Sequence, residues 1–405
     1  MENLKIVAIV VSLITFLISC HTDDNEIEPV PLQPRELVSR TVLVYMVGDA
    51  GDYNNELSAL FKTNFSDMKE GMKEVDYSKY NLLVYSELVN DVPHLISLKK
   101  VGSKVVADTI FTYEEQNPLD IEVMSSVISQ TVNYFPAESY GLVFLSHSDS
   151  WLPAGNNANT RSIGYYRRME MNISDFYQAI SSFSQRLKFI LFDSCSMQSV
   201  EVAYELRNCA EYFIGSPTEI PGPGAPYSTL VPELFAETDL PVRIADAYYS
   251  YYEKRYNGTI PFYNWTGGVG VSVLRSDALD HLAIATKSIF LNYYQNISKI
   301  EKSDIVKYDY SINDANYDLD GLILQLTGGA ENNDYLHWRK VFDEACIYWS
   351  TTEFNYSSIV DRMIPMQNSK GISCWIPNDS YNSDLNIFFR TFQWYFATGW
   401  DEVGW

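Results

Sequence analysis

The sequence predicts an α/β fold, with a mostly parallel sheet covered by helices on both faces. Continuous apolar runs at 41–47, 82–85 and 141–145 suit strands that are buried on both faces of a sheet. Helical patterns separate these runs, and strands that alternate with helices favour parallel pairing. Hydrophobic residues make up 46% of the 405-residue chain and charged residues 20%, so the chain can bury a large core.

The expected elements alternate from residue 40 to residue 275. Asp120 is placed to cap a helix whose apolar residues recur three and four positions apart, and Pro136 ends that helix. Gly102 marks the turn of a hairpin. In order, we expect strands at 41–47 and 82–85, a hairpin over 94–113, a helix at 120–135, a strand at 141–145, a helix around 176–183, and strands at 189–192, 212–214 and 269–274.

Beyond residue 275 the chain is predicted to be mainly helical. Helical patterns cover 277–296, 336–351 and 384–396, and a short strand lies at 371–376. Because no clear linker precedes these segments, we expect helical C-terminal additions that complete the same compact unit.

The chain is strongly acidic, with 52 Asp and Glu residues against 29 Lys and Arg and a formal net charge of −23. Such a surface repels nucleic-acid phosphates, so we expect no nucleic-acid partner. The charge favours solubility, and it also attracts divalent cations or basic substrates.

The N-terminus predicts a lipoprotein signal peptide over residues 1–19. Lys5 precedes an apolar run at 6–18, which is too short for a comfortable membrane span. The run ends Leu17-Ile-Ser-Cys20, which resembles a bacterial lipobox, where the chain is cut before a cysteine that is then acylated. The alternative is an ordinary signal peptide that happens to end near a cysteine.

Residues 20–38 form an expected tether, because they are acidic and rich in proline and have little to bury. An acidic stretch directly after a lipidated cysteine is similar to surface-export signals of Bacteroidetes lipoproteins. We therefore expect a protein anchored by lipid in the bacterial cell envelope, on the outer-membrane surface, with a folded domain over 39–405.

Two predicted strands end in residues capable of nucleophilic chemistry. His147 follows the strand at 141–145, and Cys195 follows the strand at 189–192. Ligands of parallel sheets bind outside the carboxyl ends of the strands, and a thiol becomes a good nucleophile beside an imidazole. The two residues are therefore a candidate catalytic dyad. Each also has a plainer interpretation, as a packed cysteine and as an ordinary surface or core histidine.

The chain has five cysteines but no Cys-x-x-Cys pair and no Cys/His cluster with zinc spacing. An odd number in a secreted chain means that at least one is unpaired or modified. We expect Cys20 to carry lipid and Cys195 to be a nucleophile. Cys209, Cys346 and Cys374 lie in largely apolar sequence and are expected to be small buried residues.

Several segments resemble blocks of the clostripain family of cysteine peptidases, and they occur in the family's order. The segment Phe192-Asp-Ser-Cys-Ser-Met-Gln-Ser-Val-Glu-Val-Ala-Tyr-Glu-Leu206 closely resembles the cysteine block, and 135–147 resembles the histidine-bearing strand. Segments 41–49 and 54–57 are similar to the opening strand and its loop, 219–227 to the loop after the cysteine, and 371–377 to a late strand. Together they cover nearly all of the chain after the tether.

The resemblance implies a caspase-like α/β fold, shared with gingipains and legumains, and hydrolysis of peptides or proteins after Arg or Lys. It gives His147 the role of base or acid and Cys195 that of nucleophile. Asp193 becomes a candidate floor for the pocket of the basic substrate side chain, and its plainer interpretation is a structural carboxylate. Calcium stimulates some relatives, so it is a candidate cofactor, although no EF-hand loop is present.

One departure from the family follows the histidine. Members usually carry His-Gly-x-Gly-Trp, whereas this chain has Ser148, Asp149 and Ser150 between His147 and Trp151. The first Gly is thought to offer its N–H to the oxyanion hole, and Ser148 keeps that N–H. A side chain at this position is strained if the backbone requires a positive φ. Asp149 is a further carboxylate placed to serve substrate or His147.

Relatives are often cut between the catalytic His and Cys, and a polar loop lies there over 155–168. We predict self-cleavage after Arg161, or less readily after Arg168. Two other functions stay open. One is a catalytically impaired peptidase fold used for binding, which the missing glycines favour. The other is a glycan-binding surface lipoprotein, which 30 Tyr and 8 Trp allow.

Overall fold

The computed structural model describes residues 33–51, 56–154, 162–261, 265–310, 316–377 and 383–404. Within it, Pro34–Trp405 forms one compact unit. The expected signal peptide and Cys20 lie outside the described residues. Of the expected tether, the described end packs on the domain, because Arg35 N–H donates to Tyr134 O and Val38 pairs with Ala137.

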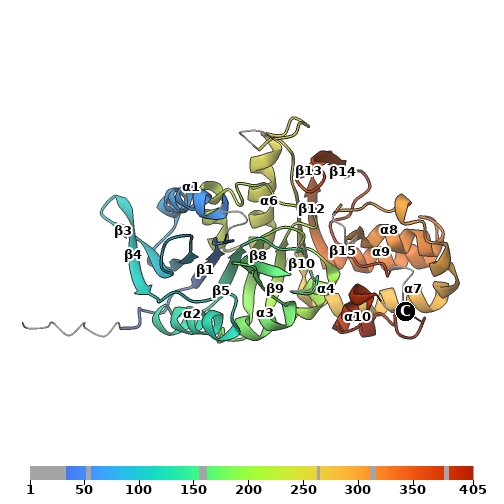
Figure 1. The fold of residues 1–405 in the computed structure, drawn as a ribbon, viewed down its shortest axis with the longest axis horizontal. Helices are drawn as coiled ribbons and strands as arrows, with labels where there is room; N and C mark the ends of the chain where they lie inside the picture. Colours follow the sequence, from blue (N-terminus) through green and yellow to red (C-terminus); the bar gives the residue numbers. More distant parts are fainter. Residues whose placement is uncertain are drawn as a thin grey trace, which may run out of the picture. The chain divides into compact units, whose positions relative to one another are not determined.

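A nine-stranded sheet forms the centre of this unit (Figure 1). Its spatial order is β12 (Cys346–Thr351), β10 (Gly270–Arg275), β9 (Ala210–Gly215), β8 (Leu187–Asp193), β5 (Tyr140–Leu145), β1 (Arg40–Val47), β2 (Tyr80–Glu87), β3 (His94–Val101) and β4 (Lys104–Thr112). The pairings from β2 through β1, β5 and β8 to β9 are parallel, and the outer pairings are antiparallel. The structure confirms the predicted α/β class with a mostly parallel sheet.

Helices cover both faces of the sheet, as Figure 1 shows for α2 and α3 on one side and α1 and α6 on the other. One face carries α2 (Ile121–Tyr134), α3 (Ile173–Ile180) and α4 (Val200–Glu205), and the other carries α1 (Glu56–Gly71), α5 (Tyr227–Leu230) and α6 (Leu240–Glu253).

The central strands are apolar at every position because successive side chains enter different cores. Leu43, Tyr45 and Val47 of β1 join the core under α2, whereas Val42 and Val44 join the core under α6. Each large apolar side chain buried in this way contributes roughly 1.5–3 kcal/mol.

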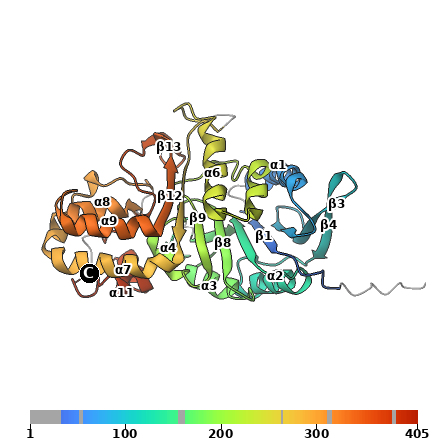
Figure 2. The same cartoon turned by 180° about the vertical axis from the view of Figure 1, so that it is seen from behind.

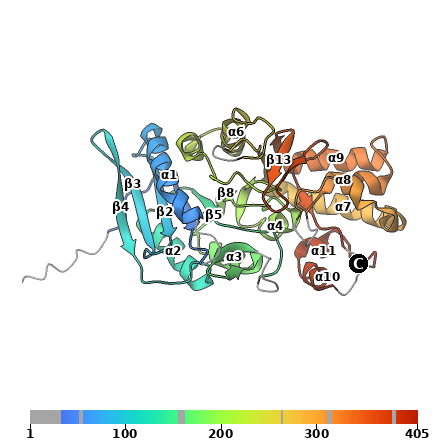
Figure 3. The same cartoon turned by 45° about the horizontal axis from the view of Figure 1, so that its top comes forward.

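The C-terminal part is mainly helical, with α7 (Leu279–Tyr293), α8 (Leu319–Thr327), α9 (Asn333–Ala345), α10 (Asp384–Phe389) and α11 (Gln393–Ala397). Figures 2 and 3 show α7, α8 and α9 stacked together beyond the edge strand β12. None of the helices in the described ranges combines the length and apolar character that a membrane crossing requires.

Short elements complete the unit. The strands are β6 (Ile163–Tyr166), β7 (Met169–Met171), β11 (Tyr317–Asp318), β13 (Phe354–Ser357), β14 (Arg362–Pro365) and β15 (Ser373–Cys374). The 3₁₀ helices are η1 (Met72–Glu74), η2 (Val231–Phe235), η3 (Ser276–Ala278), η4 (Tyr294–Lys299) and η5 (Lys302–Asp304).

Three local expectations were wrong. The helix expected over 336–351 ends at Ala345, because the aromatic and β-branched run that follows pairs as β12 with β10. The helix expected over 384–396 is broken between α10 and α11, where Phe392 is extended with φ −79° and ψ 143°. Asp120 precedes α2 but does not cap it with its side chain, which accepts from Asn117 instead.

Candidate active site

His147 and Cys195 follow neighbouring parallel strands at the same level. In the pairing of β5 with β8, Leu145 lies opposite Asp193. His147 therefore comes two residues after the last pair on one strand, and Cys195 two residues after it on the other. Both side chains are half-buried. The sheet thus delivers an imidazole and a thiol to the same edge, where parallel sheets bind their ligands.

The loops that carry the two residues are joined by hydrogen bonds. Ser148 Oγ donates to the backbone carbonyl of Cys195 across 2.7 Å. One residue before the cysteine, Ser194 Oγ donates to Phe144 O of β5 across 3.2 Å. Each loop is therefore held by a hydroxyl donating to a backbone carbonyl on the other side of the strand pair.

The backbone after His147 explains which glycine of the family run is replaced without strain. Ser148 is not among the residues with positive φ, whereas Ser150 has φ 63°. A side chain is therefore tolerated at Ser148, and the strained position is Ser150. Ser148 forms an antiparallel bridge with Ile163, in which the Asp149 N–H donates to Ser162 O across 3.0 Å.

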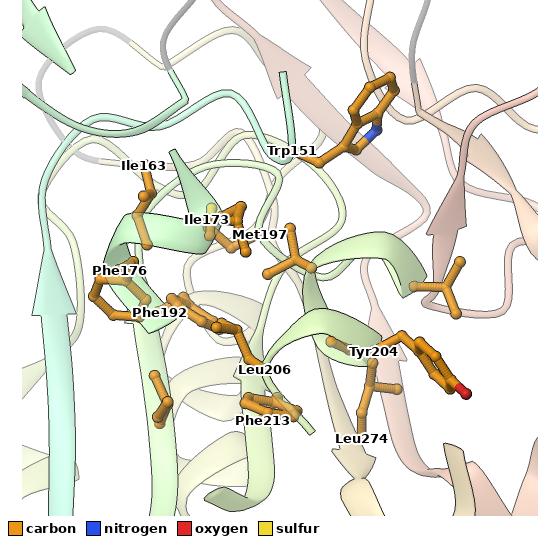
Figure 4. Close-up of a cluster of buried hydrophobic side chains, with 14 of the residues drawn as sticks. Trp151, Ile163, Ile173, Phe176, Phe192, Met197, Tyr204, Leu206, Phe213 and Leu274 are labelled. Carbon is orange, nitrogen blue, oxygen red and sulfur yellow. The ribbon is translucent and has the colours of Figure 1, made fainter. Parts of the chain in front are cut away.

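The loop after Cys195 is fixed by the segment that follows β9. Ser196, in the left-handed region with φ 59°, donates its N–H to Thr218 O, and the Gln198 N–H donates to Ser216 O. Met197 between them is fully buried in the core shown in Figure 4. The Ser199 hydroxyl then accepts from Val202 N and caps α4. The nucleophile candidate thus sits in a tight turn with little freedom.

Asp193 lies inside the protein, 2% exposed, below the Cys195 turn. Its Oδ2 accepts from Ala225 N at 3.0 Å and from Tyr227 Oη at 2.8 Å, and its Oδ1 accepts from Tyr248 Oη at 3.2 Å. Burial raises the pKa of this carboxyl, and the three hydrogen bonds oppose that rise. These tyrosines come from α5 and α6, and sequence reasoning did not identify them as its partners.

The loop that contains Ala225 approaches this carboxylate closely. Gly224 has φ 76°, and a Cβ added there would lie 3.0 Å from Asp193 Oδ2. A glycine is therefore required at this position both by conformation and by space. Hydrogen bonds from Ala225 and Tyr227 to Asp193 thus help to hold the loop 219–227, which resembles a family block.

All four described cysteines, Cys195, Cys209, Cys346 and Cys374, carry thiols rather than disulfides. Burial raises the pKa of Cys209 and of Cys346 to about 12, and it also raises the pKa of Cys374. Such thiols stay protonated near neutral pH and are poor nucleophiles. Cys374 is buried as expected, whereas Cys209 and Cys346 are only partly buried.

A second polar cluster lies at the ends of β1 and β2, and sequence reasoning missed it. Arg167 Nε donates to the buried Asp49 carboxylate at 2.6 Å, and its Nη1 pairs with Glu115. The buried Glu87 accepts from Asp49 N, and burial raises its pKa to about 8. The pairing fixes the β6–β7 hairpin on the ends of these strands.

The structure describes one of the two predicted cleavage positions, Arg168. Arg161 lies outside the described residues. Arg168 is exposed and lies with Arg167 in the two-residue turn between β6 and β7, where their φ angles are 71° and 45°. This is the geometry of a tight hairpin turn. Asp149 is half-buried beside the start of β6.

Over the described ranges, we find no group of three His, Cys, Asp or Glu side chains arranged to hold a metal ion.

Comparison with known proteins agrees with the geometry. The model of the clostripain family matches residues 44–392. A secreted C11 cysteine protease from Bacteroides thetaiotaomicron, solved with an irreversible peptide inhibitor, is 40% identical, with a TM-score of 0.80 over 90% of this chain and 99% of its own. An inactive zymogen C11 protease from Parabacteroides distasonis is 30% identical, with a TM-score of 0.76 over the same shares.

A cysteine protease from B. fragilis is 39% identical, with a TM-score of 0.56 over 63% of this chain and 98% of its own. No curated protein sequence matches the chain. The family model covers most of the sequence, and two solved proteases share at least 30% identity over nearly their whole length. This chain belongs to the clostripain family of cysteine peptidases.

Proposed function

We propose that the protein hydrolyses peptide bonds after Arg or Lys through a catalytic dyad of His147 and Cys195. The observation that carries this proposal is the position of the two residues, each two places beyond the paired ends of β5 and β8. Backbone and hydroxyl hydrogen bonds hold both loops in place, which supports the proposal. A preorganised nucleophile and base are what covalent catalysis requires.

The chemistry follows the usual course of a thiol nucleophile. The Cys195 thiolate attacks the substrate carbonyl carbon, and the negative charge that develops on its oxygen is held by the N–H groups of Ser148 and Cys195. His147 gives its proton to the leaving amine when the C–N bond breaks. A water molecule then attacks the thioester, with His147 taking its proton, and the C–S bond breaks to release the acid and regenerate the Cys195 thiolate.

Specificity for a basic side chain rests on Asp193 in this proposal. Its three hydrogen-bond donors are neutral, and a carboxylate offers about four acceptor positions, so a guanidinium can still add a charged hydrogen bond. Its position two residues before Cys195 supports this role. The competing role is structural, because the same carboxylate anchors the 219–227 loop through Ala225 and Tyr227.

Variants of the dyad test the proposal with a short peptide amide that has Arg before the cleaved bond. Cys195→Ala should abolish turnover and retain peptide binding. His147→Ala should reduce kcat about a hundred- to ten-thousand-fold, the usual contribution of general acid–base catalysis. Wild-type hydrolysis by Cys195→Ala, in a preparation free of other peptidases, contradicts the assignment.

A catalytically impaired fold is the competing function, suggested by the serine that replaces the first glycine. The backbone argues against it, because Ser148 is not in the left-handed region and keeps its N–H. Turnover of the Arg amide by the wild-type protein separates the two functions.

We also propose activation by cleavage after Arg161, with Arg168 as the less favoured position. The supporting observation is that Arg168 lies in a tight two-residue turn between β6 and β7. A protease binds its substrate as an extended segment, and this turn is too short to supply one, so cleavage after Arg168 is disfavoured. A related protease has been solved as an inactive zymogen. N-terminal sequencing of active protein tests this, and full activity of a single uncut chain contradicts it.

Membrane attachment is proposed through acylation of Cys20, on the strength of the sequence Leu17-Ile-Ser-Cys20. Intact-mass analysis of protein extracted from membranes should show acyl chains on Cys20. A mature chain that starts elsewhere and carries no lipid contradicts the anchor and leaves the peptidase proposal unaffected.

A further inference from the structure

Trp375 contacts elements that follow both members of the dyad. Its ring meets the ring of Trp151 edge-on, with centroids 5.5 Å apart and an interplanar angle of 67°. Its backbone N–H donates to Glu201 Oε1 across 2.8 Å. Trp151 ends the loop that starts at His147, and Glu201 lies in α4, directly after the Cys195 turn. One residue of the C-terminal part therefore joins the two catalytic segments.

Trp151 is enclosed by aromatic rings that come from the C-terminal part of the chain. It is 0% exposed, and its ring centroid lies between 5.5 and 6.3 Å from those of four residues, Trp375, Phe388, Phe389 and Phe392. Figure 4 shows its ring apart from the rings of Phe176, Phe192 and Phe213, which come from α3, β8 and β9. The end of the histidine loop thus packs against residues of the C-terminal part of the chain.

Trp375 is itself held on several sides. Its Nε1 donates to Asn386 Oδ1 of α10 across 3.1 Å. Two residues earlier, Ser373 donates its N–H to Gln198 O and forms a parallel bridge with Ser199, at the end of the Cys195 turn. Glu201 is 0% exposed, so the hydrogen bond to Trp375 lies in a dry environment where it is strong.

We propose that Trp375 is a positioning residue for peptide hydrolysis, because it sets the placement of the His147 loop relative to the Cys195 turn. This inference rests on the dyad proposed above. Proton transfer between imidazole, thiol and leaving amine requires hydrogen-bond distances, and a misplacement of 1 Å costs about a hundredfold in rate. The C-terminal additions then have a catalytic purpose, namely to complete the frame of the active site.

Three variants test the role. Trp375→Leu removes the ring contact with Trp151 and keeps the backbone hydrogen bond to Glu201. Trp375→Phe restores an aromatic edge without the indole N–H. Trp338→Leu is the matched control, since Trp338 is 1% exposed and packs with Tyr335 and Phe342 of α9, away from both catalytic segments. Both leucine variants should lower the melting temperature, and assays are run where each variant stays folded.

Two readouts separate positioning from simple loss of stability. The first is kcat on the Arg peptide amide, which should fall about a hundredfold in Trp375→Leu with little change in KM, and recover largely in Trp375→Phe. The second is the rate at which iodoacetamide alkylates Cys195, followed against pH by peptide mass mapping. The pH at which Cys195 becomes reactive should rise in Trp375→Leu, because its thiolate loses the nearby imidazolium. Trp338→Leu should match wild type in both.

Wild-type kcat and an unshifted alkylation profile in Trp375→Leu overturn the positioning role, as does an equal loss in Trp338→Leu. Failure of the dyad itself gives a different result. In that case wild-type protein shows neither turnover nor alkylation of Cys195 that depends on His147, whatever residue stands at 375.

Discussion

The hydroxyl of Ser148 donates a hydrogen bond to the backbone carbonyl of Cys195 across 2.7 Å, and so links the residue after the candidate base to the candidate nucleophile. Family members usually carry a glycine where this chain has Ser148, and a glycine has no hydroxyl to donate this hydrogen bond. The serine therefore adds a hydrogen bond between the two loops of the candidate active site.

Removal of this hydroxyl tests its contribution. Ser148→Ala should destabilise the protein by about 1 kcal/mol, the usual net value of one hydrogen bond. Its kcat should fall modestly, by about tenfold or less, because the N–H proposed for the oxyanion hole is retained. Urea unfolding and steady-state kinetics measure the two effects. A loss of activity as deep as that of His147→Ala contradicts a supporting role for the hydroxyl.

Replacement by glycine should change the stability of the protein in opposite directions at Ser150 and Ser148. Ser150 lies at φ 63°, and its buried Oγ has no hydrogen-bond partner among the described residues. Ser150→Gly should therefore stabilise the protein by about 1 kcal/mol. Ser148→Gly relieves no strain and loses a hydrogen bond, so it should destabilise. Urea unfolding of the pair decides the matter, and a stabilising Ser148→Gly contradicts the backbone assignment.

The buried carboxyl of Glu201 should make the stability of the folded protein depend on pH. Burial raises its pKa from 4.5 to about 7, while the unfolded chain keeps the ordinary value. Between these values the folded protein holds a proton that the unfolded chain has lost, so stability falls as pH rises from about 4.5 to 7 and stays low above it. Glu201→Gln lacks this titration. Its stability relative to wild type should be greater at pH 8 than at pH 5, by roughly 2–3 kcal/mol. Equal differences at both pH values in urea unfolding exclude the effect.

Removal of the charge of Asp193 should reduce the hydrolysis of basic substrates only. Asp193→Asn keeps the shape and removes the charge, so kcat/KM for an Arg peptide should fall about a hundredfold, as expected when one partner of a buried charge pair is removed. Hydrolysis of a matched peptide with Leu should change little. Tyr248→Phe is the control, since it removes one hydrogen bond to the same carboxylate and keeps the charge. Equal losses on both peptides assign Asp193 a structural role alone.

Much of the fold could be predicted because the signals are local. Apolar runs marked β1, β5 and β8 within one or two residues. The end of α9 was missed because its helical pattern continues into residues that also suit a strand, and the edge of β10 decides between the two. Tertiary pairing overrides such patterns.

The partners of the candidate site residues were not predictable in the same way. Tyr248 reaches Asp193 across 55 positions of sequence, and Trp375 reaches Glu201 across 174. No periodicity or spacing encodes such contacts, which depend on how α6 and the C-terminal part pack on the sheet. The comparison with the family's His-Gly-x-Gly-Trp run identified the segment after His147 as unusual. Only the structure shows that Ser150, and not Ser148, has the left-handed backbone.

Covalent labelling tests the central claim most directly. The protein is treated with a short peptide that ends in Arg and carries a thiol-reactive electrophile at its carboxyl end, and the modified residue is mapped by mass spectrometry. We predict one adduct, on Cys195, formed in step with loss of activity and strongly slowed in His147→Ala. Inactivation with the adduct on Cys209, Cys346 or Cys374 and an unmodified Cys195 would contradict the account.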